Sequence, residues 1–228
     1  MPSAIQEIDP IITTTLFGLF VLEPNDGVCQ EIRDGRFWDN WLLPYFDELT
    51  REEVVIEIGA SIGFHTVYMA KKCKIIHTFE PQFINYNRII KNCELNNVEN
   101  VHYYNFALYS KNCKMSINNQ PNAQKDINYN NCQACSLSLR ENDDGDIEAK
   151  TLDSFNIEKV SFIKVDAEGA DIKILNGGKE TIQKYRPKII FESGKDTTED
   201  RNNWAKESKY TIKEIAAANW LAIPIINK

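Results

Sequence analysis

Three ionisable side chains alternate along the sequence where an apolar, β-branched run ends. The run covers residues 160–165 (VSFIKV) and contains Lys164, which is followed by Asp166 and Glu168. Because successive side chains of a strand point to opposite faces, these three groups are expected on the same face. A carboxylate there could accept the proton of a hydroxyl, and the lysine could stabilise the developing alkoxide. A buried ion pair of purely structural role is the alternative, and the location at a strand end favours the functional interpretation.

A further carboxylate, Glu192, ends another apolar run, residues 188–192 (KIIFE). Acidic groups at neighbouring strand ends could hold a divalent cation through oxygen ligands, and such a cation would polarise an acceptor hydroxyl. The residue types alone leave the general-base and the metal-ligand interpretations open. We assign no residue as a metal ligand at this point.

A glycine-containing loop, GASIGF (residues 59–64), directly follows the apolar run VVIEI (54–58). A dinucleotide-binding loop needs glycine where this chain has Ser61 and Phe64, which argues against a nicotinamide or flavin cofactor. The loop also satisfies G-x-S-x-G, the nucleophile elbow of α/β-hydrolases. That fold needs a histidine well downstream, whereas the last histidine here is His102, so we reject it.

The spacing also fits the E/D-x-G-x-x-x-G loop of S-adenosylmethionine-dependent methyltransferases. Gly59 and Gly63 would let the backbone pass close to the methionine moiety, and Glu57 could engage its polar groups. Glu80 ends the next apolar run, where a carboxylate can accept hydrogen bonds from both ribose hydroxyls. The loop and Glu80 together therefore indicate one half of a cofactor site.

The elements that must position these residues alternate between strand and helix patterns. Strands are expected at 54–58, 75–79, 101–106, 160–165, 188–192, 210–215 and 220–225, and helices at 62–72, 83–95 and 170–185, the last broken at Gly177-Gly178. This alternation predicts right-handed crossovers and an α/β fold with a doubly wound, mostly parallel seven-stranded sheet. Helices would cover both faces of that sheet, and ligands would bind beyond the carboxyl ends of its strands.

We expect a single domain over residues 1–228, with an N-terminal helical or lid segment (1–53) before a Rossmann-like core (54–228). Trp38 in that segment is expected to be a core anchor or part of a lid over the cofactor. The polar stretches 111–150 and 194–209 are expected to be surface loops that shape the acceptor site. Cys132 and Cys135 form a C-x-x-C with too few neighbouring ligands for a structural zinc, so free thiols are expected.

Composition and charge limit the classes of binding partner that the chain is expected to have. The chain has 26 Lys and Arg residues against 33 Asp and Glu residues, a formal charge of −7, and no basic cluster, so nucleic acid is not expected. The best apolar run near the N-terminus, residues 11–22, is interrupted by threonines and is too short to span a bilayer. With no signal peptide either, we expect a cytoplasmic protein.

Over roughly residues 54–224 the chain resembles the FkbM family of methyltransferases. The matching segments are VVIEIGASIGFHT (54–66), FEP (79–81), NFAL (105–108), TLDSF (151–155), FIKVDAEGAD (162–171), ILNGG (174–178), RPKIIFES (186–193) and NWLAIP (219–224). Its most specific part is K-x-D-x-E-G. Two positions depart from the usual pattern: Ser61 stands where family members more often have Asn, and Asp171 stands where Glu is usual.

The resemblance implies a class I methyltransferase with S-adenosylmethionine as cofactor and S-adenosylhomocysteine as product. It implies cofactor contacts at Glu57, Gly59, Ala60, Ser61, Gly63, Thr66, Glu80, Pro81, Ala107 and Asp166. The candidate catalytic residues are Asp166, Glu168, Lys164 and His65, and Asp166 is the first candidate for an essential one. Related sugar O-methyltransferases use magnesium, so a divalent metal such as Mg²⁺ stays an open alternative.

The resemblance further implies an O-methyltransferase that acts on a hydroxyl of a sugar, glycan or related natural product. The N/D-P-P-Y/F motif of amino-nitrogen methyltransferases is absent after residues 160–165, which favours oxygen as the acceptor. Family members fused to glycosyltransferases suggest a glycosyltransferase as a joined or cooperating partner. The alternatives are a nicotinamide-dependent oxidoreductase, disfavoured by Ser61 and Phe64, and a non-catalytic cofactor-binding scaffold, disfavoured by the joint presence of Glu57, Gly59, Glu80, Asp166 and Glu168.

Overall fold

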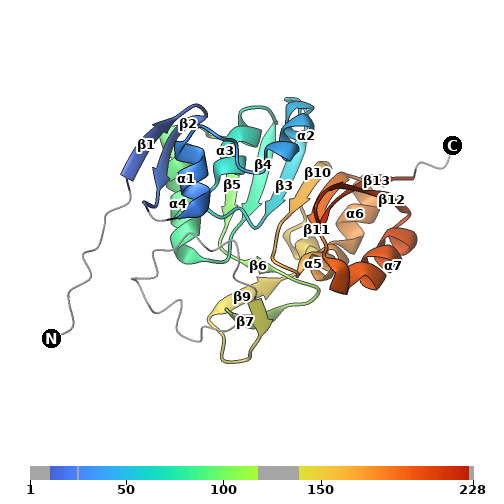
Figure 1. The fold of residues 1–228 in the computed structure, drawn as a ribbon. Helices are drawn as coiled ribbons and strands as arrows, with labels where there is room; N and C mark the ends of the chain where they lie inside the picture. Colours follow the sequence, from blue (N-terminus) through green and yellow to red (C-terminus); the bar gives the residue numbers. More distant parts are fainter. Residues whose placement is uncertain (1–10, 25, 118–138, 226–228) are drawn as a thin grey trace.

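The computed structural model describes residues 11–24, 26–117 and 139–225 (Figure 1). Its centre is a seven-stranded sheet in the order β12-β13-β11-β10-β3-β4-β5. The strands are β3 (Val54–Ile58), β4 (Ile75–Phe79), β5 (Val101–Tyr104), β10 (Val160–Val165), β11 (Lys188–Glu192), β12 (Tyr210–Ala216) and β13 (Asn219–Pro224). The pairs from β5 through β11 are parallel, and β13 runs antiparallel to both of its neighbours. The expected α/β fold with a mostly parallel seven-stranded sheet is confirmed.

Helices cover both faces of this sheet, which explains the continuous apolar strands. Every residue of β3 is buried. Val55 packs in a core with α1 (Gly27–Arg33), α2 (Leu43–Asp47), α3 (Phe64–Ala70) and α4 (Phe83–Leu95). Val54, Ile56 and Ile58 point to the other face and pack with α5 (Asp171–Gly177), α6 (Lys179–Tyr185) and α7 (Thr198–Ser208). The expected break at Gly177-Gly178 separates α5 from α6.

The order in which the strands are added to the sheet reverses at β3, although β3 is parallel to both of its neighbours. From β3 the sheet continues through β4 and β5 on one side, and through β10 and β11 on the other. In open α/β sheets a ligand crevice forms beyond the carboxyl ends of the strands at such a point. The glycine loop after β3 and the Asp166–Gly169 turn after β10 therefore meet there.

The N-terminal segment contains a β-hairpin as well as the helices that were expected. β1 (Ile11–Thr15) pairs antiparallel with β2 (Gly18–Leu22), and α1, α2 and a 3-10 turn at Asn40–Leu42 follow. The hairpin docks on α4, where Asn92 Oδ1 accepts a hydrogen bond from the Val21 N–H at 2.7 Å. No helix in the described ranges is long and apolar enough to cross a membrane.

The two stretches expected to be loops contain regular structure, so that expectation was wrong. Part of 111–150 belongs to a small sheet, β6-β9-β7-β8, with β6 (Ala107–Leu108), β7 (Cys113–Ile117), β8 (Leu139–Glu141) and β9 (Ile147–Lys150). This sheet lies beyond the carboxyl ends of the central strands (Figure 1). Within 194–209, α7 buries Trp204 and Arg201. Cys132 and Cys135 lie outside the described residues.

Candidate active site

Two adjoining cavities lie at the carboxyl ends of β3, β4 and β10. The first cavity is lined by Val28, Trp38, Asp39, Gly59, Ala60, Ser61, Phe64, His65, Glu80, Lys164, Asp166, Glu168, Glu192 and Asn219. The second cavity is lined mainly by apolar residues from the ends of β3 and β4, the small sheet and α5, including Phe79, Pro81, Phe106, Ala107, Leu108, Tyr109, Met115, Leu139 and Ile174. Gly59, Glu80, Asp166 and Glu168 line both cavities. One elongated ligand can therefore extend from the apolar second cavity into the first cavity, which we call the charged chamber.

The glycine loop passes so close to the β10 turn that only glycine fits at its first position. Gly59 has a left-handed φ of 77°, and a Cβ atom there would lie 1.8 Å from the Asp166 carbonyl oxygen. Hydrogen bonds anchor both turns, from Gly59 N–H to Phe79 O and from Asp166 N–H to Ile58 O, each 3.0 Å. The loop is thus held with its backbone open toward the cavities.

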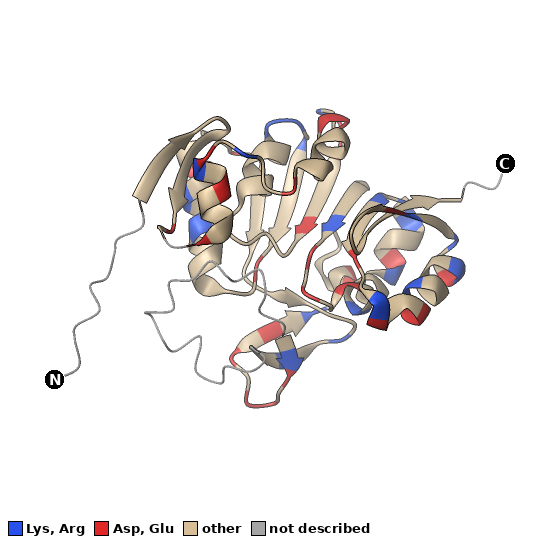
Figure 2. Cartoon of the chain, in the orientation of Figure 1, with Lys and Arg blue, Asp and Glu red and all other residues tan. Residues whose placement is uncertain are grey.

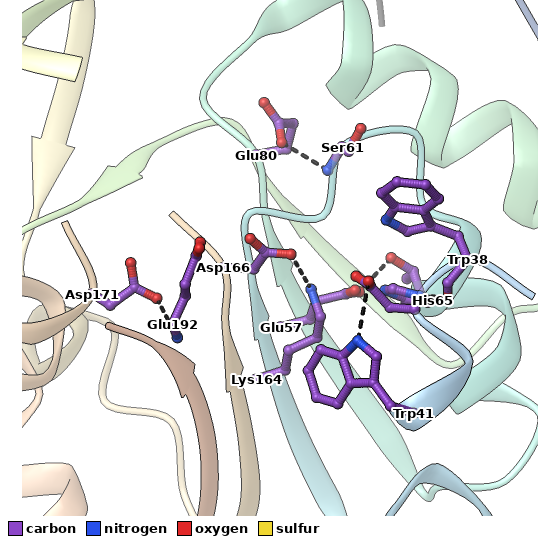
Figure 3. Close-up of polar contacts among 12 residues, drawn as sticks. Trp38, Trp41, Glu57, Ser61, His65, Glu80, Lys164, Asp166, Asp171 and Glu192 are labelled. Atoms are coloured by element: carbon purple, nitrogen blue, oxygen red, sulfur yellow. Dashed lines mark hydrogen bonds and ion pairs between the residues drawn. The ribbon is translucent and has the colours of Figure 1, made fainter. Parts of the chain in front are cut away.

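Glu80, at the end of β4, joins the glycine loop to the turn that follows it. Its Oε2 accepts the Ser61 N–H at 2.9 Å (Figure 3). Its Oε1 accepts the Gln82 N–H, also at 2.9 Å. Burial raises the pKa of this carboxyl to about 7, although the two backbone hydrogen bonds oppose the rise. Glu80 stands at the junction of the two cavities, where its oxygens could also meet a diol.

Lys164 is a buried cation among carboxylates. It is the register partner of Glu57 across β10 and β3, and its Nζ donates to Asp166 Oδ2 at 3.1 Å. Burial alone would lower the pKa of Lys164, but Asp166, Glu57 and Asp39 raise it to about 12. Figure 2 shows the acidic segments in the loops at the carboxyl ends of the central strands. The chamber therefore combines a permanent positive charge with several acidic groups.

Glu57 lies behind the glycine loop. The side chain is 0% exposed, and its Oε2 accepts the Thr66 hydroxyl at 2.5 Å. Burial raises the Glu57 pKa to about 7, and the charge of Lys164 opposes this rise. Glu57, Gly63 and Thr66 line neither cavity, whereas the other sequence-predicted residues line at least one.

His65 is buried on α3 and is occupied by a main-chain partner. Its Nε2 lies 2.9 Å from the Trp38 carbonyl oxygen, which can only accept, so Nε2 carries the proton. Its ring stacks on Phe37 with centroids 5.5 Å apart. Burial, followed by the charge of Lys164, lowers the His65 pKa to about 3. The imidazole is therefore neutral at physiological pH and ties α3 to the N-terminal segment.

Glu168 and Glu192 stand on the side of the first cavity formed by β10 and β11. Glu168 has a left-handed φ of 51° and is half-buried. Burial raises its pKa to about 7, with repulsion from Asp166 and Glu192 adding to the shift. Behind them, Asp171 Oδ1 accepts the Glu192 N–H at 3.0 Å. Among the described residues, no three His, Cys, Asp or Glu side chains are arranged to hold a metal ion, so the metal alternative gains no support.

Asp39 and Asn219 line the first cavity and were not anticipated from the sequence. Asp39 has a left-handed φ of 53° at the start of the 3-10 turn, and its Oδ1 accepts the Trp41 Nε1–H at 3.2 Å. No spacing rule links this residue to the glycine loop. In the second cavity, Met115 and Leu139 come from the small sheet, and only the alternation CKMSI (113–117) hinted at a strand there.

Residues 57–217 match the family model of the methyltransferase FkbM domain. The chain belongs to the FkbM methyltransferase family. This membership supports a methyltransferase rather than a nicotinamide-dependent oxidoreductase.

Individual relatives agree with this assignment. "Methyltransferase 1" of Beauveria bassiana (strain ARSEF 2860) is 25% identical, with 55% of this chain and 58% of the relative covered. The crystal structure of methyltransferase FkbM from Methylobacillus flagellatus KT superposes with a TM-score of 0.54 at 16% identity, covering 77% of this chain and 44% of that one. Trm5b from Pyrococcus abyssi gives 0.51 at 15% identity, covering 96% and 56%. The two structures support the fold alone, and this chain spans less than two thirds of each of the three proteins.

Proposed function

We propose that this FkbM-family protein transfers a methyl group from S-adenosylmethionine to a hydroxyl oxygen of a saccharide, glycan or related natural product. The observation that carries the proposal is the junction of the two cavities. There Glu80 and the glycine loop face the carboxylates of Asp166 and Glu168. A cofactor spanning both cavities would have its reactive centre beside these carboxylates.

The residues present fit this cofactor. The apolar walls of the second cavity, from Phe79 to Ile174, suit an adenine ring, with Pro81 and Ala107 among them. Glu80 at the junction suits the ribose hydroxyls, and Gly59 lets the loop pack directly against the Asp166 backbone while it lines both cavities. Ala60 and Ser61 continue this wall toward the charged chamber. When bound, S-adenosylmethionine supplies a methyl group activated by its positively charged sulfur.

We assign the proton transfer to Glu168. Its pKa of about 7 leaves a substantial fraction deprotonated near neutral pH, as a general base requires. The acceptor O–H would give its proton to a Glu168 carboxylate oxygen. Asp166 would orient the acceptor through its cavity-facing carboxylate, and the charge of Lys164 would stabilise the oxygen as it loses its proton. No step needs a metal.

The remaining candidate residues support the site from behind. Because His65 is neutral and donates from Nε2 to Trp38, we assign it a positioning role instead of a catalytic one. Glu57 and Thr66 are buried behind the glycine loop, and Gly63, with a φ of 79°, packs against Ile89. These three would fix the shape of the loop rather than touch the cofactor.

The resemblance suggests the saccharide class of the acceptor, and two observations support an oxygen acceptor that is not a nucleic acid. The sequence after β10 is Asp-Ala-Glu-Gly, without the amide and prolines of amino-nitrogen methyltransferases. The net charge of −7 and the acidic lining of the first cavity disfavour a nucleic-acid acceptor. A cooperating glycosyltransferase and a cytoplasmic location also belong to this proposal, from the resemblance and the sequence alone.

The first test is calorimetric titration with S-adenosylhomocysteine, with EDTA and again with added Mg²⁺. We expect micromolar affinity under both conditions. No binding at millimolar ligand would overturn the proposal, and binding that requires Mg²⁺ would overturn the metal-free assignment. A second test incubates isotopically labelled methyl donor with a panel of saccharides and identifies O-methyl ethers by mass spectrometry. A labelled product that carries its methyl on nitrogen would refute the oxygen acceptor.

A further inference from the structure

The amino-acid end of the cofactor carries an α-ammonium group, which needs a counter-charge. This inference rests on the proposed function. The apolar second cavity suits the base and Glu80 suits the ribose, so the amino-acid end falls in the first cavity beside the glycine loop. The acidic residues on this side of the cavity are therefore candidates to meet the ammonium.

Asp39 lies on the side of the first cavity where the glycine loop and α3 are found. The preceding residue, Trp38, accepts a hydrogen bond from His65 of α3, the helix that begins directly after the loop. Trp41 Nε1 donates to Asp39 Oδ1 at 3.2 Å, and the other carboxylate oxygen accepts no hydrogen bond from any described residue. The Asp39 side chain lines the first cavity. One oxygen is thus fixed by the protein while the other stays available to a ligand.

The charges around Asp39 favour one more cation. Asp39, Glu57 and Asp166 all act on Lys164, a buried lysine that lines the first cavity. Glu57 Oε1 is buried without a hydrogen-bond partner in the described residues. Burial raises the Asp39 pKa, and Lys164 offsets only part of that rise. A second positive group would therefore bring this set of carboxylates closer to charge balance.

Two other acidic residues of the first cavity, Glu168 and Glu192, stand on the side formed by β10 and β11, whereas Glu80 is assigned to the ribose and Asp166 is paired with Lys164. Glu168 lies in the turn after β10 and Glu192 is the last residue of β11, and Figure 3 shows Glu192 across Asp166 from Trp38 and His65. Because Glu168 is the proposed base, we expect the acceptor, and not the amino-acid end of the cofactor, to bind on that side of the cavity. Glu192 is consequently a matched acidic residue that should not meet the ammonium.

We infer that Asp39 binds the α-ammonium group of the methyl donor, and that His65 and Trp41 are positioning residues for its carboxylate. Asp39 precedes residues 57–217, the part of the chain that matches the family model. The N-terminal segment would thus contribute a cofactor contact that the family signature does not contain.

The test compares Asp39→Asn with Glu192→Gln by calorimetric titration with S-adenosylhomocysteine. Asparagine keeps an acceptor for Trp41 and removes only the charge. A lost charge-assisted hydrogen bond predicts affinity weakened by about tenfold to a hundredfold for Asp39→Asn, against less than about threefold for Glu192→Gln. Thermal unfolding of both variants, with the exposed Asp34→Asn as a surface control, checks that each protein is folded.

A second ligand locates the effect within the cofactor. 5′-Methylthioadenosine keeps the base, ribose and sulfur but lacks the amino-acid end, so Asp39→Asn should leave its binding unchanged. An unchanged S-adenosylhomocysteine affinity, or an equal loss in Asp39→Asn and Glu192→Gln, would overturn the inference. Equal weakening of both ligands by Asp39→Asn would overturn it too. Failure of the wild-type protein to bind S-adenosylhomocysteine would instead contradict the proposed function, and the inference would fall with it.

Discussion

Lys164 and Asp166 form an ion pair that reaches from the interior into the crevice. The Nζ and Oδ2 atoms are 3.1 Å apart, with 3% of the lysine side chain and 39% of the aspartate side chain exposed. Lys164 also sits opposite Glu57 in the register of the sheet. The Lys164 cation therefore interacts with two carboxylates. If Lys164 is removed, water can reach Asp166, but Glu57 stays buried.

Removing this cation should destabilise the fold more than removing its partner. In Lys164→Met, Glu57 and Asp166 lose their counter-charge, and we expect the free energy of unfolding to fall by about 3–5 kcal/mol at pH 8. Asp166→Asn should cost less because Lys164 keeps Glu57 and Asp39 nearby. Urea unfolding of the two variants measures the difference. Equal stability of Lys164→Met and wild type would show that the lysine charge is dispensable.

Glu168→Gln should separate chemistry from binding. Without the base we expect kcat to fall by about 10²–10⁴-fold, while S-adenosylhomocysteine affinity changes little. In the wild type the deprotonated carboxylate is the active form, so the rate should fall as pH drops below about 7, the pKa of Glu168. A pH–rate profile of wild type, flat between pH 6 and 8, would exclude Glu168 as the base.

Asp171 should make the wild type lose stability as pH rises. Burial, followed by repulsion from Asp166, raises its pKa from 3.8 to about 7 in the folded state. Between these values the folded protein binds more protons than the unfolded chain, so Asp171 lowers stability as pH rises through this range. The free energy of unfolding of Asp171→Asn, relative to that of wild type, should therefore increase by up to about 4 kcal/mol between pH 4 and pH 7.5.

The measurement is chemical unfolding of wild type and Asp171→Asn at a series of pH values. Asparagine keeps an oxygen to accept the Glu192 N–H, so the comparison isolates the charge. The exposed Glu99→Gln serves as a control and should keep the slope of the wild type. A constant difference between wild type and Asp171→Asn across the pH series would contradict a raised Asp171 pKa.

Three glycines should respond to alanine in graded fashion. Gly59→Ala places a Cβ 1.8 Å from the Asp166 carbonyl, and we expect loss of cofactor binding and of about 3 kcal/mol or more of stability. Gly169 has a φ of 89° but open space around it, so its alanine variant should lose only about 1–2 kcal/mol of backbone energy. Gly27→Ala has neither constraint and should stay within about 0.5 kcal/mol of wild type. Thermal unfolding and S-adenosylhomocysteine titration rank the three, and a Gly59→Ala variant as stable as Gly169→Ala would contradict the close approach at Gly59.

The central strands were predictable because burial on both faces demands an uninterrupted apolar run. β3, β4, β10 and β11 begin and end at the expected residues, as does α4. The hairpin β1–β2, the small sheet and α7 were missed for the opposite reason. No long, evenly apolar run marks any of the three: threonines fill β1, the strands of the small sheet are short, and α7 is mostly polar. All three still bury side chains, such as Phe20 in β2, Met115 in the small sheet and Trp204 in α7.

The site divides in the same way. Lys164, Asp166 and Glu168 were predicted together, and all three line the first cavity because one short segment carries them. The expected strand alternation does not extend to the two acidic residues, because β10 ends at Val165 and Glu168 has a left-handed φ of 51° in the turn that follows. Asp39 could not be found so, since its place depends on a left-handed turn far from the glycine loop in sequence. The partner of His65 was equally hidden, because a main-chain carbonyl leaves no signature in residue types.

Asn219 of β13 faces the same chamber as Val28, Trp38 and Asp39 from the N-terminal segment. The chamber is consequently assembled from contributions near both ends of the described chain. During synthesis its lining stays incomplete until β13 has emerged and paired with β11. A ligand that fills this chamber would contact both the N-terminal segment and β13, and would stabilise them together. Its binding would therefore show that β13 has joined the sheet.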